Sequence, residues 1–345
     1  MINYFRNRFT EMKKIINISL SVLTTMLFVS TSCSEWTEPE NLDFRHQTPE
    51  EIDPAAYEAY LSGVREYKKT EHKLMFVTMK GTADHPSSQN QHLMAMPDSA
   101  DVVCVTMMDE EIHPVIAAEI DEVFKRKSTE VFLNVDYAPI HTAWGLLEDK
   151  RADEGRPAAT DEEITAFFKA QTEAQLENCG KYGFHGIQVT FVGNRATHYA
   201  QVSQDAYIAA VMDYYKKNSS IKLMFRGSAR NIESKEFLDI VSHIVIIAGE
   251  EKKLSSLVTR LGTAPTNRII MEVTVPSVDN PVQIGRSVVE AAEWVIAESA
   301  NEKFTPLGVA VSNAYDDYFN KTLEFSNIKK AMAIMNPSQT EESEK

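Results

Sequence analysis

The chain has 345 residues, of which 43% are hydrophobic, and this allows either one α/β barrel or two domains of ordinary size. Its formal net charge of −15 argues against a nucleic-acid-binding protein, because such proteins carry basic patches. The cysteines form no Cys-x-x-Cys and no Cys/His pattern, so we expect no bound metal and no cofactor. The spacing of Cys104 and Cys179 gives no support for a disulfide between them.

The first 32 residues are predicted to be a targeting segment. Lys13 and Lys14 precede an apolar run over 15–29, which is the pattern of a secretory signal and is short for a membrane span. The run ends at small residues before Cys33, as at a bacterial lipoprotein cleavage site, so we expect Cys33 to be lipidated. An unlipidated cysteine in a secreted protein is the alternative. Residues 33–54 are polar, contain three prolines and are expected to form a tether.

Eight short apolar runs then recur at regular spacing. They are rich in Val, Ile and Phe and nearly continuous in apolarity, as strands covered on both faces should be. We predict strands over residues 73–79, 101–107, 130–136, 186–192, 222–226, 243–248, 268–275 and 308–312.

The segments between these runs carry apolar residues at helical spacing. We predict helices over residues 110–127, 161–180, 204–218, 234–241, 251–261, 281–299 and 322–335. Thr160 and Glu163 form a capping box at one start, and Gly180 and Gly262 indicate helix ends. Eight strands with intervening helices predict a single-domain (β/α)8 TIM barrel over 55–338, followed by a polar tail over 339–345. A doubly wound open sheet is the alternative, but the sequence lacks the glycine loop expected for it.

In a TIM barrel the functional residues lie at the carboxyl ends of the strands. Residues of this kind are our candidates for ligand binding: Lys80, Asp136, Tyr137, Trp144, Gln188, Thr190, Asn194, Arg226, Glu250, Glu272, Asn313, Tyr315, Asp316 and Tyr318. The aromatic rings could stack on a ligand or could pack in the core, and Trp144 is expected in a loop with His141. We expect Asp136 and Glu272 to be structural ion-pair partners of Lys80 and Arg226.

The segments FVTMKGT, VFLNVDY, GFHGIQVTFV and GVAVSNAYDDYF, in this order, resemble glycoside hydrolase family 18 over about residues 73–337. The similarity is greatest to the lipoprotein branch in glycan-utilisation loci of gut Bacteroidetes, which includes endo-β-N-acetylglucosaminidases acting on N-glycans. The resemblance implies a TIM barrel, a lipid anchor in the outer membrane at the cell surface, and a glycan ligand. It also implies SusC/SusD-like importer components as possible partners.

The most informative stretch is the fourth predicted strand, where family 18 carries DGxDxDxE. The resemblance implies a substrate-assisted hydrolysis, in which the final Glu protonates the leaving oxygen and the preceding Asp orients the substrate acetamide. Here the four acidic positions hold other residues, which are His185, Gln188, Thr190 and Val192. Only the glycine is kept, and no Asp or Glu occurs between residues 178 and 204. Loss of the general acid alone should lower the rate by about two to four orders of magnitude.

We therefore expect no catalytic residue on this strand. The sequence favours a cell-surface glycan-binding lipoprotein on a catalytically disabled barrel, capturing N-acetylglucosamine-containing glycans for uptake. An active glycosidase that uses a relocated carboxylate (Asp136, Glu250 or Glu272) is one alternative. A scaffold within an outer-membrane importer complex is another.

Overall fold

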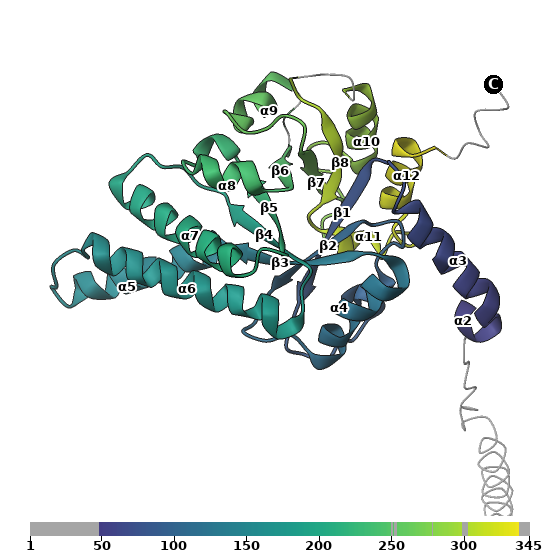
Figure 1. The fold of residues 1–345 in the computed structure, drawn as a ribbon, viewed down its shortest axis with the longest axis horizontal. Helices are drawn as coiled ribbons and strands as arrows, with labels where there is room; N and C mark the ends of the chain where they lie inside the picture. The colour runs from purple at the N-terminus through teal and green to yellow at the C-terminus, as the bar shows by residue number, and fades with distance from the viewer. Residues whose placement is uncertain (1–47, 250, 252–253, 278, 299–302, 338–345) are drawn as a thin grey trace, which may run out of the picture. The chain divides into compact units, whose positions relative to one another are not determined.

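The computed structural model describes residues 48–249, 251, 254–277, 279–298 and 303–337. The predicted signal segment, Cys33, Glu250 and the polar tail lie outside the described residues. The chain forms two compact units, residues 1–57 and residues 58–345, and the second unit contains the barrel. Its eight parallel strands pair in chain order, and β8 closes on β1 (Figure 1). The predicted TIM barrel is confirmed, and the open-sheet alternative is wrong.

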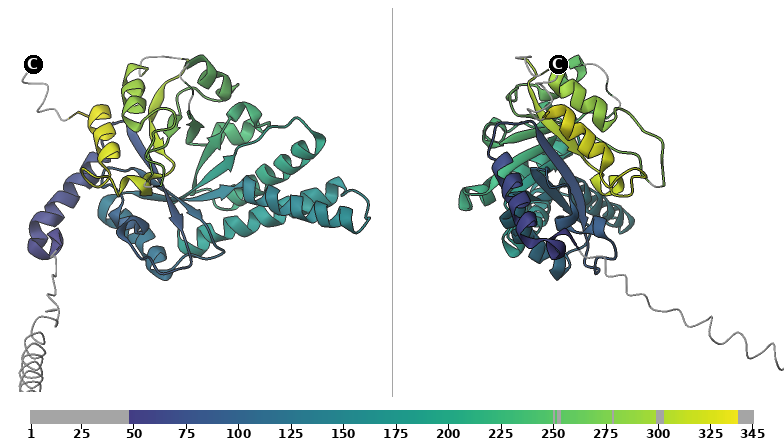
Figure 2. Two further views of the ribbon diagram at one scale, coloured as in Figure 1. Left: turned by 180° about the vertical axis from the view of Figure 1, so that it is seen from behind. Right: turned by 90° about the vertical axis from the view of Figure 1, so that its right-hand side faces the viewer.

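The strands agree with the predicted ones to within two residues at each end. They are β1 (Leu74–Gly81), β2 (Val102–Met107), β3 (Glu130–Asp136), β4 (Gly186–Phe191), β5 (Lys222–Gly227), β6 (His243–Ile247), β7 (Ile269–Val273) and β8 (Pro306–Val311). Helices surround the strands, as the two further views in Figure 2 show. The apolar side chains between strands and helices form the larger core cluster.

The helices of the described residues are α2 (Pro49–Ile52), α3 (Pro54–Tyr67), α4 (Pro114–Lys127), α5 (Tyr137–Asp153), α6 (Asp161–Tyr182), α7 (His198–Lys217), α8 (Lys235–Ile240), α9 (Leu254–Leu261), α10 (Val288–Ala297), α11 (Ala314–Asp317) and α12 (Ser326–Met335). The described residues also form three short 3-10 helices, η1 (Gln89–Gln91), η2 (Leu93–Ala95) and η3 (Ala229–Asn231). Several helices begin later than predicted, and α7 begins earlier, because its start is set by the Thr197 cap on the amide of Ala200.

The ends of α6 show how local signals set a helix. The capping box at its start is confirmed, since the Glu163 amide donates to the Thr160 hydroxyl at 3.3 Å and the Thr160 amide to the Glu163 carboxylate at 3.0 Å. The predicted stop at Gly180 is wrong. That residue lies within the last turn, and the helix is ended by Gly183, whose φ of 73° is in the left-handed region that favours glycine. Gly262, with a φ of 62°, follows α9 as predicted.

The largest correction concerns the segment after β3. We expected a loop there, but Tyr137–Asp153 form α5, capped by the Asp136 carboxylate, which accepts from the Ala138 amide at 2.9 Å. Pro139 and Gly145 gave the segment the composition of a loop, yet proline is tolerated in the first turn of a helix, where its missing donor costs nothing. Helices α5 and α6 lie side by side and project from the strands together (Figures 1 and 2). We call them the α5–α6 hairpin.

The interior of the barrel is filled by layers of side chains from alternate strands. In the register of the sheet, one apolar layer near the amino ends of the strands consists of Phe76, Phe132, Met224 and Ile270. Gly186 is needed beside it, because a Cβ there would lie 2.4 Å from the Phe132 ring. The retained glycine of the β4 motif therefore has a packing role. Above this layer the interior becomes steadily more polar toward the carboxyl ends of the strands.

Candidate functional site

The carboxyl-terminal mouth of the barrel is lined by polar side chains. Following the register upward, one layer holds Thr78, Asn134, Arg226 and Glu272, the next holds Thr106, Thr190, Ile247 and Ser312, and the uppermost holds Lys80, Asp136, Ser228 and Thr274. Strand pairing fixes the height of each of these residues along the barrel axis. The mouth therefore brings hydroxyls, a lysine and a carboxylate together above a buried ion pair.

The two interior positions of β4 are occupied by neutral, buried side chains. The amide Nε2 of Gln188 donates to Asn134 Oδ1 at 3.0 Å, and the Thr190 hydroxyl donates to the same oxygen at 2.6 Å. Asn134 in turn donates to the Thr106 hydroxyl at 3.2 Å, and the Cys104 thiol to Gln188 Oε1 at 3.5 Å. A closed set of neutral hydrogen bonds thus stands where the family motif has carboxylates.

The two ends of the motif lie at opposite ends of β4. Val192 directly follows the strand and is 63% exposed at the mouth. His185 precedes the strand, its Nδ1 accepts from the Val131 amide at 3.1 Å, and burial lowers its pKa. At the position that the family gives to the proton donor, this chain presents an exposed aliphatic side chain.

The predicted pairing of Arg226 with Glu272 is confirmed. The guanidinium donates from Nε and Nη2 to the two carboxylate oxygens of Glu272, each at 2.5 Å, and the Glu272 side chain is only 5% exposed. Both carboxylate oxygens of Glu272 are therefore occupied by charge-assisted hydrogen bonds inside the barrel. This arrangement suits a structural pair.

The predicted pairing of Lys80 with Asp136 is wrong. In the described part of the chain no ion pair joins them, because Asp136 is used as the cap of α5, and the Lys80 ammonium lies 4.7 Å from the centre of the Tyr315 ring. Burial raises the pKa of Asp136, partly offset by its hydrogen bond from Ala138 and by the charge of Arg226. Asp136 is thus a mouth carboxylate with a raised pKa.

Two of the four predicted aromatic residues, Tyr137 and Trp144, pack in the core. Tyr137 is 6% exposed, and its hydroxyl lies 2.8 Å from the Ser203 hydroxyl. Trp144 is also 6% exposed, packs on Phe167 with ring centres 5.1 Å apart, and sits on α5 where a loop was expected. Tyr318 is partly exposed, and its ring packs edge-on against Phe319 and Phe325. Tyr315 is also partly exposed, and its ring remains available at the mouth for contact with a sugar.

The remaining predicted polar residues have local structural contacts. Asn313 donates to the Val275 carbonyl and accepts from the Val275 amide, both at 2.9 Å, and so joins the ends of β7 and β8. It also donates to the Asp316 carboxylate at 2.9 Å. Asn194 accepts from the Ala196 amide at 2.9 Å in the exposed loop after β4. Asn194 therefore remains accessible to a ligand, whereas Asn313 and Asp316 are committed to the loop after β8.

One pocket was missed because α5 was missed. It has a volume of about 440 Å³ and lies between α5, the start of α6 and the start of α7, and we call it the hairpin pocket. Trp144 and Glu148 reach it from α5, and Tyr199 reaches it from α7. The four-residue spacing of Trp144 and Glu148 could have indicated this pocket, because residues four apart share one face of a helix.

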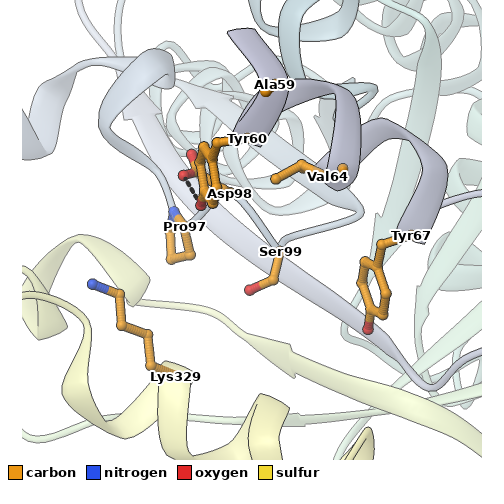
Figure 3. A pocket seen from close by; sticks show the side chains of 9 residues that line it. Ala59, Tyr60, Val64, Tyr67, Pro97, Asp98, Ser99 and Lys329 are labelled. Carbon is orange, nitrogen blue, oxygen red and sulfur yellow. Dashed lines mark hydrogen bonds between the residues drawn. The ribbon is translucent and has the colours of Figure 1, made fainter. Parts of the chain in front are cut away.

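A second pocket, of about 570 Å³, lies between α3, residues 97–99 and α12 (Figure 3). In it the Tyr60 hydroxyl donates to Asp98 at 2.6 Å, and the Lys127 ammonium pairs with the other Asp98 oxygen at 2.6 Å. Asp98 precedes β2, so this pocket is remote in the fold from the carboxyl ends of the strands. Its carboxylate is engaged in holding α3 and α4 together.

Within the described ranges, no group of three or more His, Cys, Asp or Glu side chains is arranged to hold a metal ion. Cys104 and Cys179 are both buried free thiols. None of the helices in the described part is long and apolar enough to cross a membrane.

The family model of glycoside hydrolase family 18, BT1044-like, matches residues 37–334. The chain belongs to glycoside hydrolase family 18. The predicted family resemblance is thereby confirmed at the level of the family. No curated protein matches the sequence.

Solved structures of family 18 proteins share the fold at low sequence identity. An endo-β-N-acetylglucosaminidase from Cordyceps militaris aligns with a TM-score of 0.57 at 16% identity over 81% of this chain and 96% of its own. A Glu-to-Gln variant of BT1044 aligns with a TM-score of 0.56 at 17% identity over 84% of this chain and 96% of its own. A fungal family 18 endo-β-N-acetylglucosaminidase gives 0.51 at 10% identity, over 77% and 99%. At these identities the likeness concerns the barrel fold.

Proposed function

We propose that this family 18 chain binds N-acetylglucosamine-containing glycans and does not hydrolyse them. The observation that carries the proposal is the chemistry of β4, where Gln188 and Thr190 are buried neutral groups and Val192 is exposed at the mouth. Substrate-assisted hydrolysis needs a proton donor and a carboxylate beside the acetamide. None of these three side chains can supply either.

The mouth keeps features that suit a sugar ligand. Thr274 and Asn194 are exposed and offer neutral hydrogen-bonding groups for hydroxyls and acetamides. Tyr315, with Lys80 over its ring, is partly exposed at the end of β8 and offers an apolar face for a pyranose. The names of the structural neighbours, endo-β-N-acetylglucosaminidases, support N-acetylglucosamine as the ligand class.

The proposal extends to the place of action. The apolar run before Cys33 supports a lipidated protein anchored in the outer membrane and exposed at the cell surface. A protein so placed would capture glycans for uptake beside SusC/SusD-like importer components. A scaffold role in the same assembly predicts no glycan binding at all, so a binding measurement separates the two ideas.

One observation favours a second candidate, a glycosidase with a relocated acid. Asp136 lies in the uppermost layer of the mouth, and burial raises its pKa, as a general acid requires. Glu272 is a poorer candidate, because Arg226 occupies both its oxygens. Against Asp136 stands its hydrogen bond from the Ala138 amide, which stabilises the ionised form and commits one oxygen to the cap of α5.

Calorimetric titration with N,N′-diacetylchitobiose and with an N-glycopeptide tests the binding proposal. We expect binding heat for the wild type, weaker binding for Tyr315→Ala, and wild-type binding for the matched surface control Tyr60→Ala. Absence of binding to either ligand would overturn the proposal. The enzyme candidate is tested by mass spectrometry of released sugars after long incubation, where release lost in Asp136→Asn would establish Asp136 as the acid.

A further inference from the structure

The Lys80 ammonium stands at the rim of the mouth without a carboxylate partner. Lys80 is exposed and belongs to the uppermost interior layer. Its Nζ lies 4.7 Å from the centre of the Tyr315 ring, and within the described ranges it forms no ion pair. The attraction between an exposed ammonium and a tyrosine ring is weak. The three N–H donors of this ammonium are therefore available to an anion that enters the mouth.

A second cation lies deeper in the mouth and has an accessible nitrogen. Arg226 donates to Glu272 from Nε and Nη2, whereas its Nη1 forms no hydrogen bond within the described part of the chain and is not a buried atom. The Arg226 side chain is 22% exposed. Because the apolar layer that contains Phe132 fills the barrel below, this exposed part of the guanidinium faces the mouth. The two N–H donors of Nη1 are thus open to a ligand.

The carboxylates inside the mouth add little repulsion toward an anion. Both oxygens of Glu272 accept from Arg226, so its charge is paired. Asp136 caps α5, and burial raises its pKa, which means that its negative charge is destabilised where it lies. Strand β4 adds neutral side chains where the family motif has carboxylates. The described interior layers therefore hold two cations and two carboxylates, in a chain whose net charge is −15.

The carboxylates on the loops around the mouth are bound within their own loops. Asp109, which follows β2, accepts from the Ala83 amide at 2.9 Å. Asp316, which follows β8, accepts from Asn313 Nδ2 at 2.9 Å. Neither forms an ion pair with Lys80 in the described part of the chain. The rim therefore leaves the charge of Lys80 uncompensated by a direct contact.

We propose that the mouth binds a glycan that carries an anionic group, either a sugar carboxylate or a sulfate ester. The anionic group pairs with the Lys80 ammonium at the rim, and Nη1 of Arg226 donates to an oxygen of the sugar that reaches into the barrel. The neutral β4 permits this binding, because carboxylates on that strand would repel an anionic ligand. This inference rests on the proposed function and names the class of glycan that the mouth selects.

The test titrates N-acetyllactosamine, its sialylated form and its form sulfated on the N-acetylglucosamine into the protein by calorimetry. The three ligands share one neutral core, and the two modified forms distinguish a carboxylate from a sulfate. We expect at least one anionic form to bind about tenfold more tightly than the core, the gain from one charge-assisted hydrogen bond. This preference should shrink when NaCl is raised from about 0.05 M to about 0.5 M, because salt screens exposed charges.

Three variants locate the binding of the anionic group. Lys80→Gln removes the charge at the rim and should weaken the binding of the anionic form to the level of the neutral core. Asp136→Asn removes a negative charge from the same layer and keeps the cap of α5, so it should strengthen binding of the anionic form. Lys125→Gln is the matched control, because it removes one exposed lysine charge from α4, and it should bind like the wild type.

The outcomes separate this inference from the proposed function. Equal binding of the neutral core and of both anionic forms would overturn the anionic class and leave the proposed function standing. A preference for an anionic form that is unchanged in Lys80→Gln would overturn the site at the rim. Absence of binding to all three ligands and to N,N′-diacetylchitobiose would overturn the proposed function as well.

Discussion

Replacing Glu272 with glutamine tests whether this carboxylate is structural. In the wild type its two oxygens accept from Arg226 at 2.5 Å each, and its side chain is 5% exposed. Glutamine keeps the shape and removes the charge, so the guanidinium of Arg226 is left buried without a counter-charge. Breaking a fully buried pair costs about 3–5 kcal/mol. Because the Arg226 side chain is 22% exposed, water screens part of this cost, and we expect a loss of about 2–4 kcal/mol.

The loss is measured by urea denaturation at pH 7, followed by circular dichroism. The double variant Arg226→Met, Glu272→Leu leaves no charge behind, so it should be within about 1 kcal/mol of the wild type. Asp121→Asn, which breaks the exposed pair with Lys125, is the control and should change stability by less than about 0.5 kcal/mol. Wild-type stability in Glu272→Gln, together with loss of a glycan-releasing activity, would refute the reasoning and identify Glu272 as the acid.

Three further predictions concern protonation and the β4 motif. Burial lowers the pKa of His243 from 6.5 to about 4, so the folded state favours the neutral imidazole. The free energy of unfolding is therefore highest above pH 6.5 and falls by roughly 3 kcal/mol as the pH is lowered to 4. His243→Gln should flatten this part of the pH–stability curve, and an unchanged curve would contradict the assignment. The raised pKa of Asp136 has the opposite effect, because its contribution to stability is greatest at low pH and is lost as the pH rises. Asp136→Asn keeps the cap of α5, so at pH 7 it should unfold at a higher urea concentration than the wild type. Near pH 3 this difference should disappear. The double variant Thr190→Asp, Val192→Glu restores two carboxylates of the family motif, and we expect it to release detectable sugar at some cost in stability. If this variant binds glycan but releases no sugar, the mouth does not hold the glycosidic bond beside β4.

Strand positions and barrel closure could be predicted from the sequence, because strands covered by helices on both faces are nearly continuous apolar runs. Arg226 and Glu272 could be paired in advance, since β5 and β7 are alternate strands whose interior residues share a layer. The pairing of Lys80 with Asp136 failed for a local reason. The α5 helix takes the Asp136 carboxylate as its cap, and α5 was hidden by Pro139 and Gly145.

The burial of the aromatic side chains could not be predicted from the sequence. Tyr137, Trp144 and Tyr315 all follow strand ends, yet only Tyr315 remains partly exposed at the mouth. The exposure of a ring depends on helices from other parts of the chain that pack against it, and here α6 packs against Trp144. Likewise, the hairpin pocket needs three helices to be placed before Glu148 and Tyr199 can be recognised as neighbours.

The most direct test of the central claim is mass-spectrometric detection of released sugars after long incubation of the purified protein with N-glycoproteins and chitooligosaccharides, with calorimetric titration of the same ligands. Measurable binding heat with no released sugar is the predicted result, and it would establish glycan capture without hydrolysis. Release of a sugar by the wild type that persists in Val192→Ala would contradict the claim, because it would show that a carboxylate outside β4 performs the reaction.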